Sequence, residues 1–277
     1  MKITTINISL FLIGLFGSIP FIAKSQKLPQ IQQTGKLAPA DIKIDGKTTE
    51  WNDEFQAHNL NNRIYYTISN DDSNLYLTVR TSDGYGNEKA IFGISFTVKL
   101  PSEKGGKSKE NVMVTFPPLS EVRKTTPIRL TMTTIRQQKA DTTNSGKKKM
   151  DSLRLFANKY INETFKEINV TGIKNIPERS ISIYNAEGIK VAAQLNEHFQ
   201  YTYELAIPLK YLGPSINNGQ KFSYNIKMNG LPEKAPDSPY APPTISGNVL
   251  TTVGADNLYV TYATDFSGTY TLVKKGG

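Results

Sequence analysis

Residues 42–51 read IKIDGKTTEW and include Trp51, the one tryptophan in the sequence. A short run with β-branched residues ends in the pair Asp45-Gly46, which is a strong turn signal. A tryptophan just beyond such a turn can fold back over the end of a sandwich core, since a large ring needs apolar neighbours. The stretch therefore indicates the start of a β-rich domain, with Asp45, Gly46 and Trp51 in structural roles.

Beyond this turn, apolar and polar residues alternate as they do in strands with one buried face. The runs 64–68 and 75–79 are separated by the polar turn NDDSN at 70–74 and predict a β-hairpin. Further strands are expected at 92–98, 112–116, 128–135, 181–184, 189–195, 201–207, 222–228, 258–262 and 269–273. Many short strands joined by turns favour a mainly β chain that forms an antiparallel β-sandwich of jelly-roll type.

Residues 150–168 break the alternation, because their apolar side chains recur at every third or fourth position. This spacing predicts one amphipathic helix, for which Asp151 is an available N-cap. Such a helix must cover something apolar, and a sheet or an open sheet edge is the expected surface. Together with the lysine-rich sequence before it, the helix forms a basic and helical insertion at about 99–168.

The first 25 residues have the composition of a cleaved secretory signal, with Lys2 before an apolar run and small residues at 23 and 25. An uncleaved membrane anchor is the alternative, but the run is short, is interrupted by glycine and proline, and has no basic flank after it. Residues 26–40 have a linker composition, and 41–277 are expected to form a single domain. There is no cysteine, so the domain relies on core burial without disulfides. We therefore expect a periplasmic or secreted protein with no stable membrane span after cleavage.

The formal net charge of +9 falls to +7 on cleavage, because Lys2 and Lys24 leave with the signal. The remaining excess is concentrated in two lysine clusters, at 99–109 and 139–149. Solvated loops are the ordinary interpretation, and the functional alternative is an attractive surface for an acidic glycan or another anionic surface. Nucleic acid is not an expected partner outside the cytoplasm.

No spacing in the sequence predicts a catalytic constellation, so the chain is expected not to be an enzyme. Both histidines, His58 and His198, lie in polar turns and are expected at the surface. Asp71 and Asp72 are the only metal candidates, for a structural calcium ion, and no other cofactor is expected. Glu204 lies in a strand pattern, and we expect either a structural pair with a lysine or arginine or a place on an exposed face, in preference to a catalytic role.

Several motifs occur in the order found in the family 9 carbohydrate-binding modules. These are DG at 45–46 with EW at 50–51, NLYLTV at 74–79 followed by Asp83, and YELAIPLKYLG at 203–213. From Asp41 onward the chain resembles that family, which belongs to the DOMON-like sandwiches, and its tail at 263–270 resembles exported proteins of Bacteroidetes-type bacteria. The resemblance implies a sandwich fold and a ligand site on loops at one end. In sugar-binding members two tryptophans enclose a terminal saccharide, and here Tyr85 and Tyr240 are the loop aromatics that would substitute for them.

The sequence thus predicts an exported, non-enzymatic module that binds a carbohydrate or another cell-envelope ligand, with Tyr85 and Tyr240 as contacts. The alternative is a structural or assembly protein of the bacterial envelope, in which the insertion docks an envelope protein.

Overall fold

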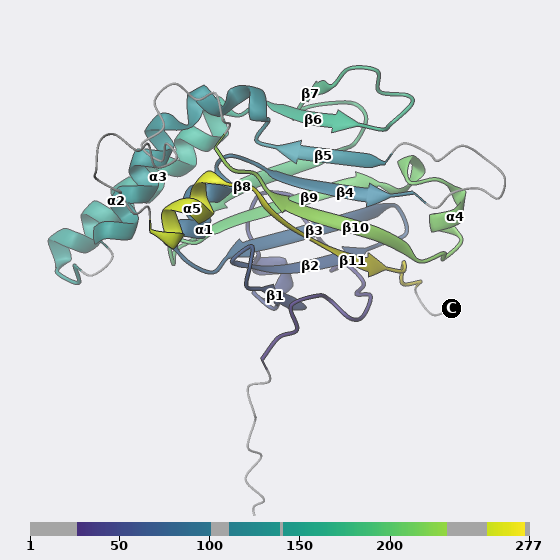
Figure 1. The fold of residues 1–277 in the computed structure, drawn as a ribbon, viewed down its shortest axis with the longest axis horizontal. Helices are drawn as coiled ribbons and strands as arrows, with labels where there is room; N and C mark the ends of the chain where they lie inside the picture. Colours follow the sequence, from purple (N-terminus) through teal and green to yellow (C-terminus); the bar gives the residue numbers. More distant parts are fainter. Residues whose placement is uncertain (1–26, 101–110, 139–140, 232–253, 275–277) are drawn as a thin grey trace, which may run out of the picture.

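The computed structural model describes residues 27–100, 111–138, 141–231 and 254–274. Two antiparallel sheets face one another (Figure 1). In order across the first sheet lie β1 (Ala57–Asn59), β2 (Ile64–Asn70), β3 (Asn74–Thr81), β9 (Tyr201–Pro208) and β8 (Lys190–Leu195). Across the second lie β11 (Thr264–Tyr270), β10 (Phe222–Met228), β4 (Ile94–Lys99), β5 (Val112–Phe116), β6 (Glu167–Thr171) and β7 (Ser180–Ser182). The predicted antiparallel β-sandwich is confirmed.

The alternation read from the sequence sets the register of the central strands. The predicted hairpin is β2 and β3, which place Tyr66 opposite Val79 and Ile68 opposite Leu77. All four side chains are buried, because residues two apart on a strand point to the same face. One continuous core fills the space between the sheets.

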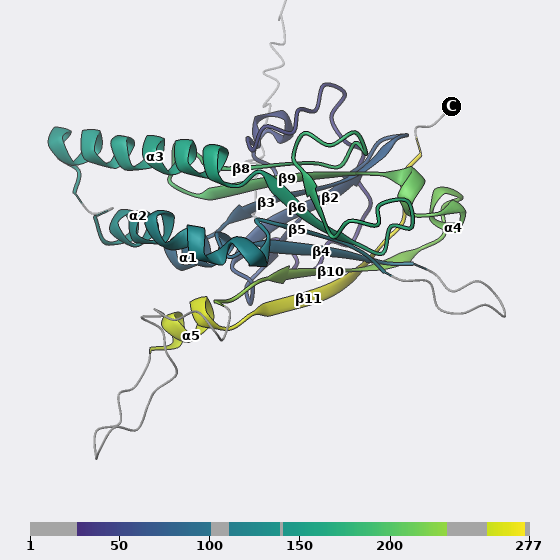
Figure 2. The ribbon, with the colours of Figure 1, turned by 90° about the horizontal axis from the view of Figure 1, so that it is seen from above.

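The helices gather at the two ends of the sandwich. Figures 1 and 2 show α1 (Gly84–Ala90), α2 (Thr126–Gln138), α3 (Asn144–Thr164) and α5 (Ala255–Thr261) at one end. The short α4 (Pro214–Asn217) lies at the opposite end. The remaining turns are the 3-10 helices η1 (Thr49–Trp51), η2 (Leu119–Thr125) and η3 (Leu209–Tyr211). None of the helices in the described part of the chain is both long and apolar enough to cross a membrane.

The insertion holds two helices where the sequence predicted one. The expected strand at 128–135 is wrong, because this segment is α2, whose buried Ile128, Met132 and Ile135 are spaced for a helix face. The second helix, α3, begins earlier than expected: Thr143 is its N-cap and accepts a hydrogen bond from Gly146 N, so Asp151 is not the cap. It ends at Thr164, and residues 167–168 belong to β6.

Two other segments also differ from the prediction. The expected strand at 258–262 lies mostly in α5, where Val260 is buried and Tyr262 is exposed.

The linker predicted at 26–40 is wrong for its described part, because the buried Gln32 amide bonds both backbone groups of Ile68. Leu37 also forms a parallel bridge with Asn70. Amino-acid composition does not predict the packing of this segment, since the contacts use mainly backbone groups and the amide of Gln32.

Candidate functional site

The DG…EW stretch surrounds a buried carboxylate, that of Glu204 on β9. Its Oε1 accepts from Trp51 Nε1 at 3.1 Å, and its Oε2 accepts from the backbone amides of Gly46 at 3.0 Å and Asp45 at 3.2 Å. Gly46 has φ +83, and a Cβ on it would lie 3.1 Å from the backbone of Ala193, so the turn requires glycine. The expected cationic partner of Glu204 is therefore wrong: three N–H donors take its place.

The side chain of Glu204 is inaccessible to solvent. Burial raises its pKa to about 7, and the hydrogen bonds from Trp51 and the two amides only partly oppose this effect. The indole of Trp51 is 3% exposed and packs on Tyr76 and Ala206 on the outer face of the first sheet. This arrangement fixes the N-terminal segment to the sheet, so Asp45, Gly46 and Trp51 have structural positions.

Tyr85 lies on α1 at the helical end. Its ring contacts two guanidinium groups, with Arg136 Cζ 4.1 Å and Arg63 Cζ 5.6 Å from the centroid. Beside it, α1 also carries Glu88, which is paired with Arg136 Nε at 2.5 Å. The ring is thus engaged within the protein, and Tyr85 does not line a described pocket. Tyr240, the other predicted contact, lies outside the described residues.

Lys89 is the second fully buried charged residue of α1. Its Nζ donates to Thr264 Oγ1 at 2.8 Å and lies 4.0 Å from the ring centroid of Tyr259. Within the described residues no carboxylate pairs with it. Burial, and next the positive charge of Arg63, lower its pKa to about 7. Because Lys89 is enclosed by α1, α5 and β11, it is not placed to meet a ligand.

The metal candidates lie in the β2–β3 turn, where Asp71 is used by the fold. Its carboxylate accepts from Ser73 N at 2.7 Å, Asn74 N at 2.6 Å and Tyr76 Oη at 2.6 Å. In the part of the chain that the structure describes, Asp71 and Asp72 belong to no group of three or more residues suited to hold a metal. These hydrogen bonds within the protein explain the position of the Asp71 carboxylate in the turn.

The histidines differ from one another. His198 is exposed in the β8–β9 turn, as predicted. His58 lies in β1 and stacks on Tyr65 with centroids 4.0 Å apart. Its burial, and then the charge of Lys27, lower its pKa below the ordinary histidine value.

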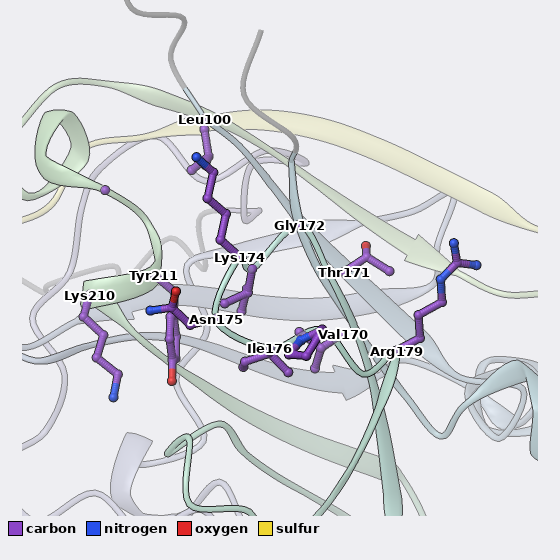
Figure 3. A pocket seen from close by; sticks show the side chains of 13 residues that line it. Leu100, Val170, Thr171, Gly172, Lys174, Asn175, Ile176, Arg179, Lys210 and Tyr211 are labelled. Carbon is purple, nitrogen blue, oxygen red and sulfur yellow. The ribbon is translucent and has the colours of Figure 1, made fainter. Parts of the chain in front are cut away.

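A pocket of about 690 Å³, which we name the loop pocket, lies at the end of the sandwich opposite the α1–α3 helices (Figure 3). One wall is the β6–β7 loop, residues 172–179, and another is η3 with Gly213. Gly172 allows the loop to turn: its φ is +77, and a Cβ there would meet Asn111 O at 2.0 Å. The buried side chains Val170, Ile173 and Ile176 provide an apolar floor.

Polar groups stand around that floor. Figure 3 shows Asn175 beside Tyr211, Lys174 extending toward Leu100, and Arg179 on the side away from Lys210. The Tyr211 ring is half-buried and is fixed by its hydroxyl, which donates to Glu187 O at 3.0 Å. The pocket therefore combines a flat ring, an amide and three cations above an apolar base, which is a composition suited to a polar ligand with apolar faces.

Sequence reasoning missed the loop pocket. Tyr211 lies inside the quoted motif YELAIPLKYLG, but only the strand part of that motif was interpreted. The GIKNIPER run at 172–179 has the glycine, asparagine and proline of an irregular loop, and this was the available signal. A second pocket of about 740 Å³ lies next to it, between the β2–β3 turn and residues 272–274, and Lys210 lines both pockets.

No family model, curated protein or solved structure matches this chain, so the resemblance to family 9 carbohydrate-binding modules stays a prediction.

Proposed function

We propose that the chain is an exported, non-enzymatic binding protein that holds a saccharide in the loop pocket. The observation that carries the proposal is the pairing of the Tyr211 ring with the Asn175 amide over an apolar floor. Flat rings pack against the apolar faces of pyranoses, while amides and charged groups bond their hydroxyls. Tyr211 takes the role that the sequence assigned to Tyr85 and Tyr240.

The lining of the loop pocket favours binding over catalysis. Among the described residues that line it there is no aspartate, glutamate or histidine, so they offer neither the two carboxylates of a glycosidase nor a general base. The buried Glu204 and Lys89 lie elsewhere, enclosed by protein. A ligand in this pocket would be held without being transformed.

Replacing Tyr211 tests the proposal. We expect the chain without residues 1–25 to bind a saccharide identified on a glycan array, and Tyr211→Ala to weaken it about 10-fold in calorimetry. Tyr211→Phe keeps the ring and should bind nearly as well. The matched control is Tyr184→Ala, because Tyr184 is 76% exposed and lies outside the pocket. Absence of saccharide binding, or equal loss in the control, would contradict the proposal.

A second candidate function is assembly with an envelope protein through the α2–α3 hairpin. The specific observation is three large apolar side chains exposed on these helices: Leu130 at 60%, Leu155 at 61% and Phe156 at 47%. Exposed apolar side chains of this size commonly mark contact surfaces. The hairpin projects beyond the sheets (Figure 2), so a partner could reach it.

This candidate predicts a partner that depends on those side chains. The double variant Leu155→Lys with Phe156→Lys should lose a cross-linked envelope protein that the unchanged chain captures. The control places the same two charges at the polar positions Ser152 and Asn162 of α3 and should retain the partner. Equal capture by both variants would rule out the hairpin as the docking surface.

A further inference from the structure

Three cationic side chains line the loop pocket without a compensating carboxylate. Lys174, Arg179 and Lys210 are all exposed, and within the described residues none of them forms an ion pair. Lys210 Nζ has one described contact, the Tyr211 ring, at 4.9 Å from its centroid. None of the described residues in the lining is acidic.

Four arginines elsewhere in the described part of the fold are paired with carboxylates. Arg63 pairs with Asp83 and Asp256, Arg80 with Asp53, Arg136 with Glu88, and Arg154 with Asp151. Lys174, Arg179 and Lys210 border one concave surface, and its described lining holds no acidic residue. Like charges on a concave surface repel one another, and they focus a positive potential into the pocket. An anionic ligand relieves that repulsion.

The arrangement of these charges also limits the ligand. The cations extend from the rim, whereas the floor is apolar and the ring of Tyr211 stands at one side (Figure 3). A small inorganic anion would meet the rim but leave the floor and the ring unused. A pyranose that bears a charged substituent uses both, because its face packs on the ring while its acidic group points to the rim.

We infer that the ligand of the loop pocket is an anionic saccharide, one that carries carboxylate or sulfate groups. The inference rests on the proposed saccharide function and specifies the chemical class of its ligand. Lys210 also lines the second pocket, but the lining of that pocket includes Asp71 and Asp72, so the anionic group is placed in the loop pocket alone.

The test compares ligands that differ only in charge. In calorimetry we expect hexagalacturonate, and a sulfated galactan oligosaccharide, to bind at low salt, and the methyl-esterified hexagalacturonate to bind at least about 10-fold more weakly. Affinity should fall as salt is raised, because the Debye length shortens from about 30 Å at 0.01 M to about 8 Å at 0.15 M.

A charge variant locates the effect in the pocket. The triple change of Lys174, Arg179 and Lys210 to Gln should weaken hexagalacturonate binding about 30-fold, since each exposed charge contributes up to about 1 kcal/mol. The control changes Lys147, Lys148 and Lys149 of α3 to Gln, which removes the same net charge at the opposite end of the molecule. That control should bind like the unchanged chain.

The outcomes separate the two proposals. If the esterified ligand binds equally well and Tyr211→Ala weakens it, saccharide binding stands and the anionic class is wrong. Binding of inorganic phosphate or of anionic phospholipid vesicles, with no saccharide bound, overturns the saccharide function itself. Equal loss in both triple variants shows long-range attraction and removes the pocket from the inference.

Discussion

Replacing Glu204 by Ala should lower the free energy of unfolding by about 3–5 kcal/mol. The change leaves three donors without their acceptor: the buried Trp51 Nε1 and Gly46 amide, and the partly buried Asp45 amide. It also leaves a cavity where a wholly buried side chain was packed. Urea unfolding, followed by the fluorescence of the single tryptophan, measures both the stability and the release of Trp51.

The control is Glu197→Ala, because Glu197 is an exposed carboxylate in the β8–β9 turn and its loss should change stability by less than about 0.5 kcal/mol. A Glu204→Ala variant as stable as this control would contradict the structural role of the DG…EW stretch. Glu204→Gln keeps the volume and one acceptor oxygen, so its loss should be intermediate.

Glu204 also gives the stability a pH dependence of known sign. Its pKa is raised from 4.5 to about 7 in the folded chain, so between these values the folded state binds more protons than the unfolded state. Its contribution is complete below about pH 4.5 and is lost as the pH rises through about 7. Glu204→Gln should remove this decline.

Lys89 should give the second large effect on stability, and it should make the free energy of unfolding rise with pH. Burial lowers its pKa from 10.5 to about 7, so between these values the unfolded state binds more protons. Stability should therefore rise with pH from about 7 to about 9.5, by up to about 3.5 kcal/mol. Above about pH 10 the buried tyrosines, such as Tyr66 with its raised pKa, oppose the rise. Denaturant unfolding at a series of pH values measures this slope.

Lys89→Met should flatten that slope and stabilise the chain near pH 7, since an unpaired buried amine is replaced by an apolar side chain of similar length. Lys227→Met, at an exposed position of β10, is the matched control and should keep the slope. A slope that persists in Lys89→Met would show that another group titrates. In the unchanged chain the two opposite slopes place a stability minimum near pH 7.

The sequence predicted those parts of the fold in which local pattern and burial agree. Strands such as β8 and β10 alternate in sequence, and their burial alternates in the same way. The pattern was ambiguous at 128–135 and 258–262, where β-branched and aromatic residues suit a strand but the packing of α2 on α3 and of α5 on α1 selects a helix. Tertiary contact decides such segments, and a local pattern does not contain it.

The candidate site could not be predicted from local sequence patterns, because it is formed by contacts between distant parts of the chain. Trp51 and Glu204 are 153 positions apart, so neither motif reveals the other as its hydrogen-bond partner. The loop pocket joins residues near 100, 175 and 211, and each piece taken alone has the sequence of an ordinary turn. The aromatic loop residue Tyr85 was the more visible candidate, and the structure shows its ring occupied by arginines.

The packing of residues 27–38 against the strands bears on the order in which the chain becomes able to fold. Tyr270 Oη bonds Lys36 O across 234 positions, and Val273 N bonds Asn70 Oδ1 across 203. Closing loops of this length carries an entropic penalty that is offset only when both partners are present. During synthesis, residues 27–38 must therefore wait for β11 and the residues after it before these contacts can form. The edge of the domain that residues 27–38 cover therefore lacks its partners until nearly all of the described chain has been synthesised.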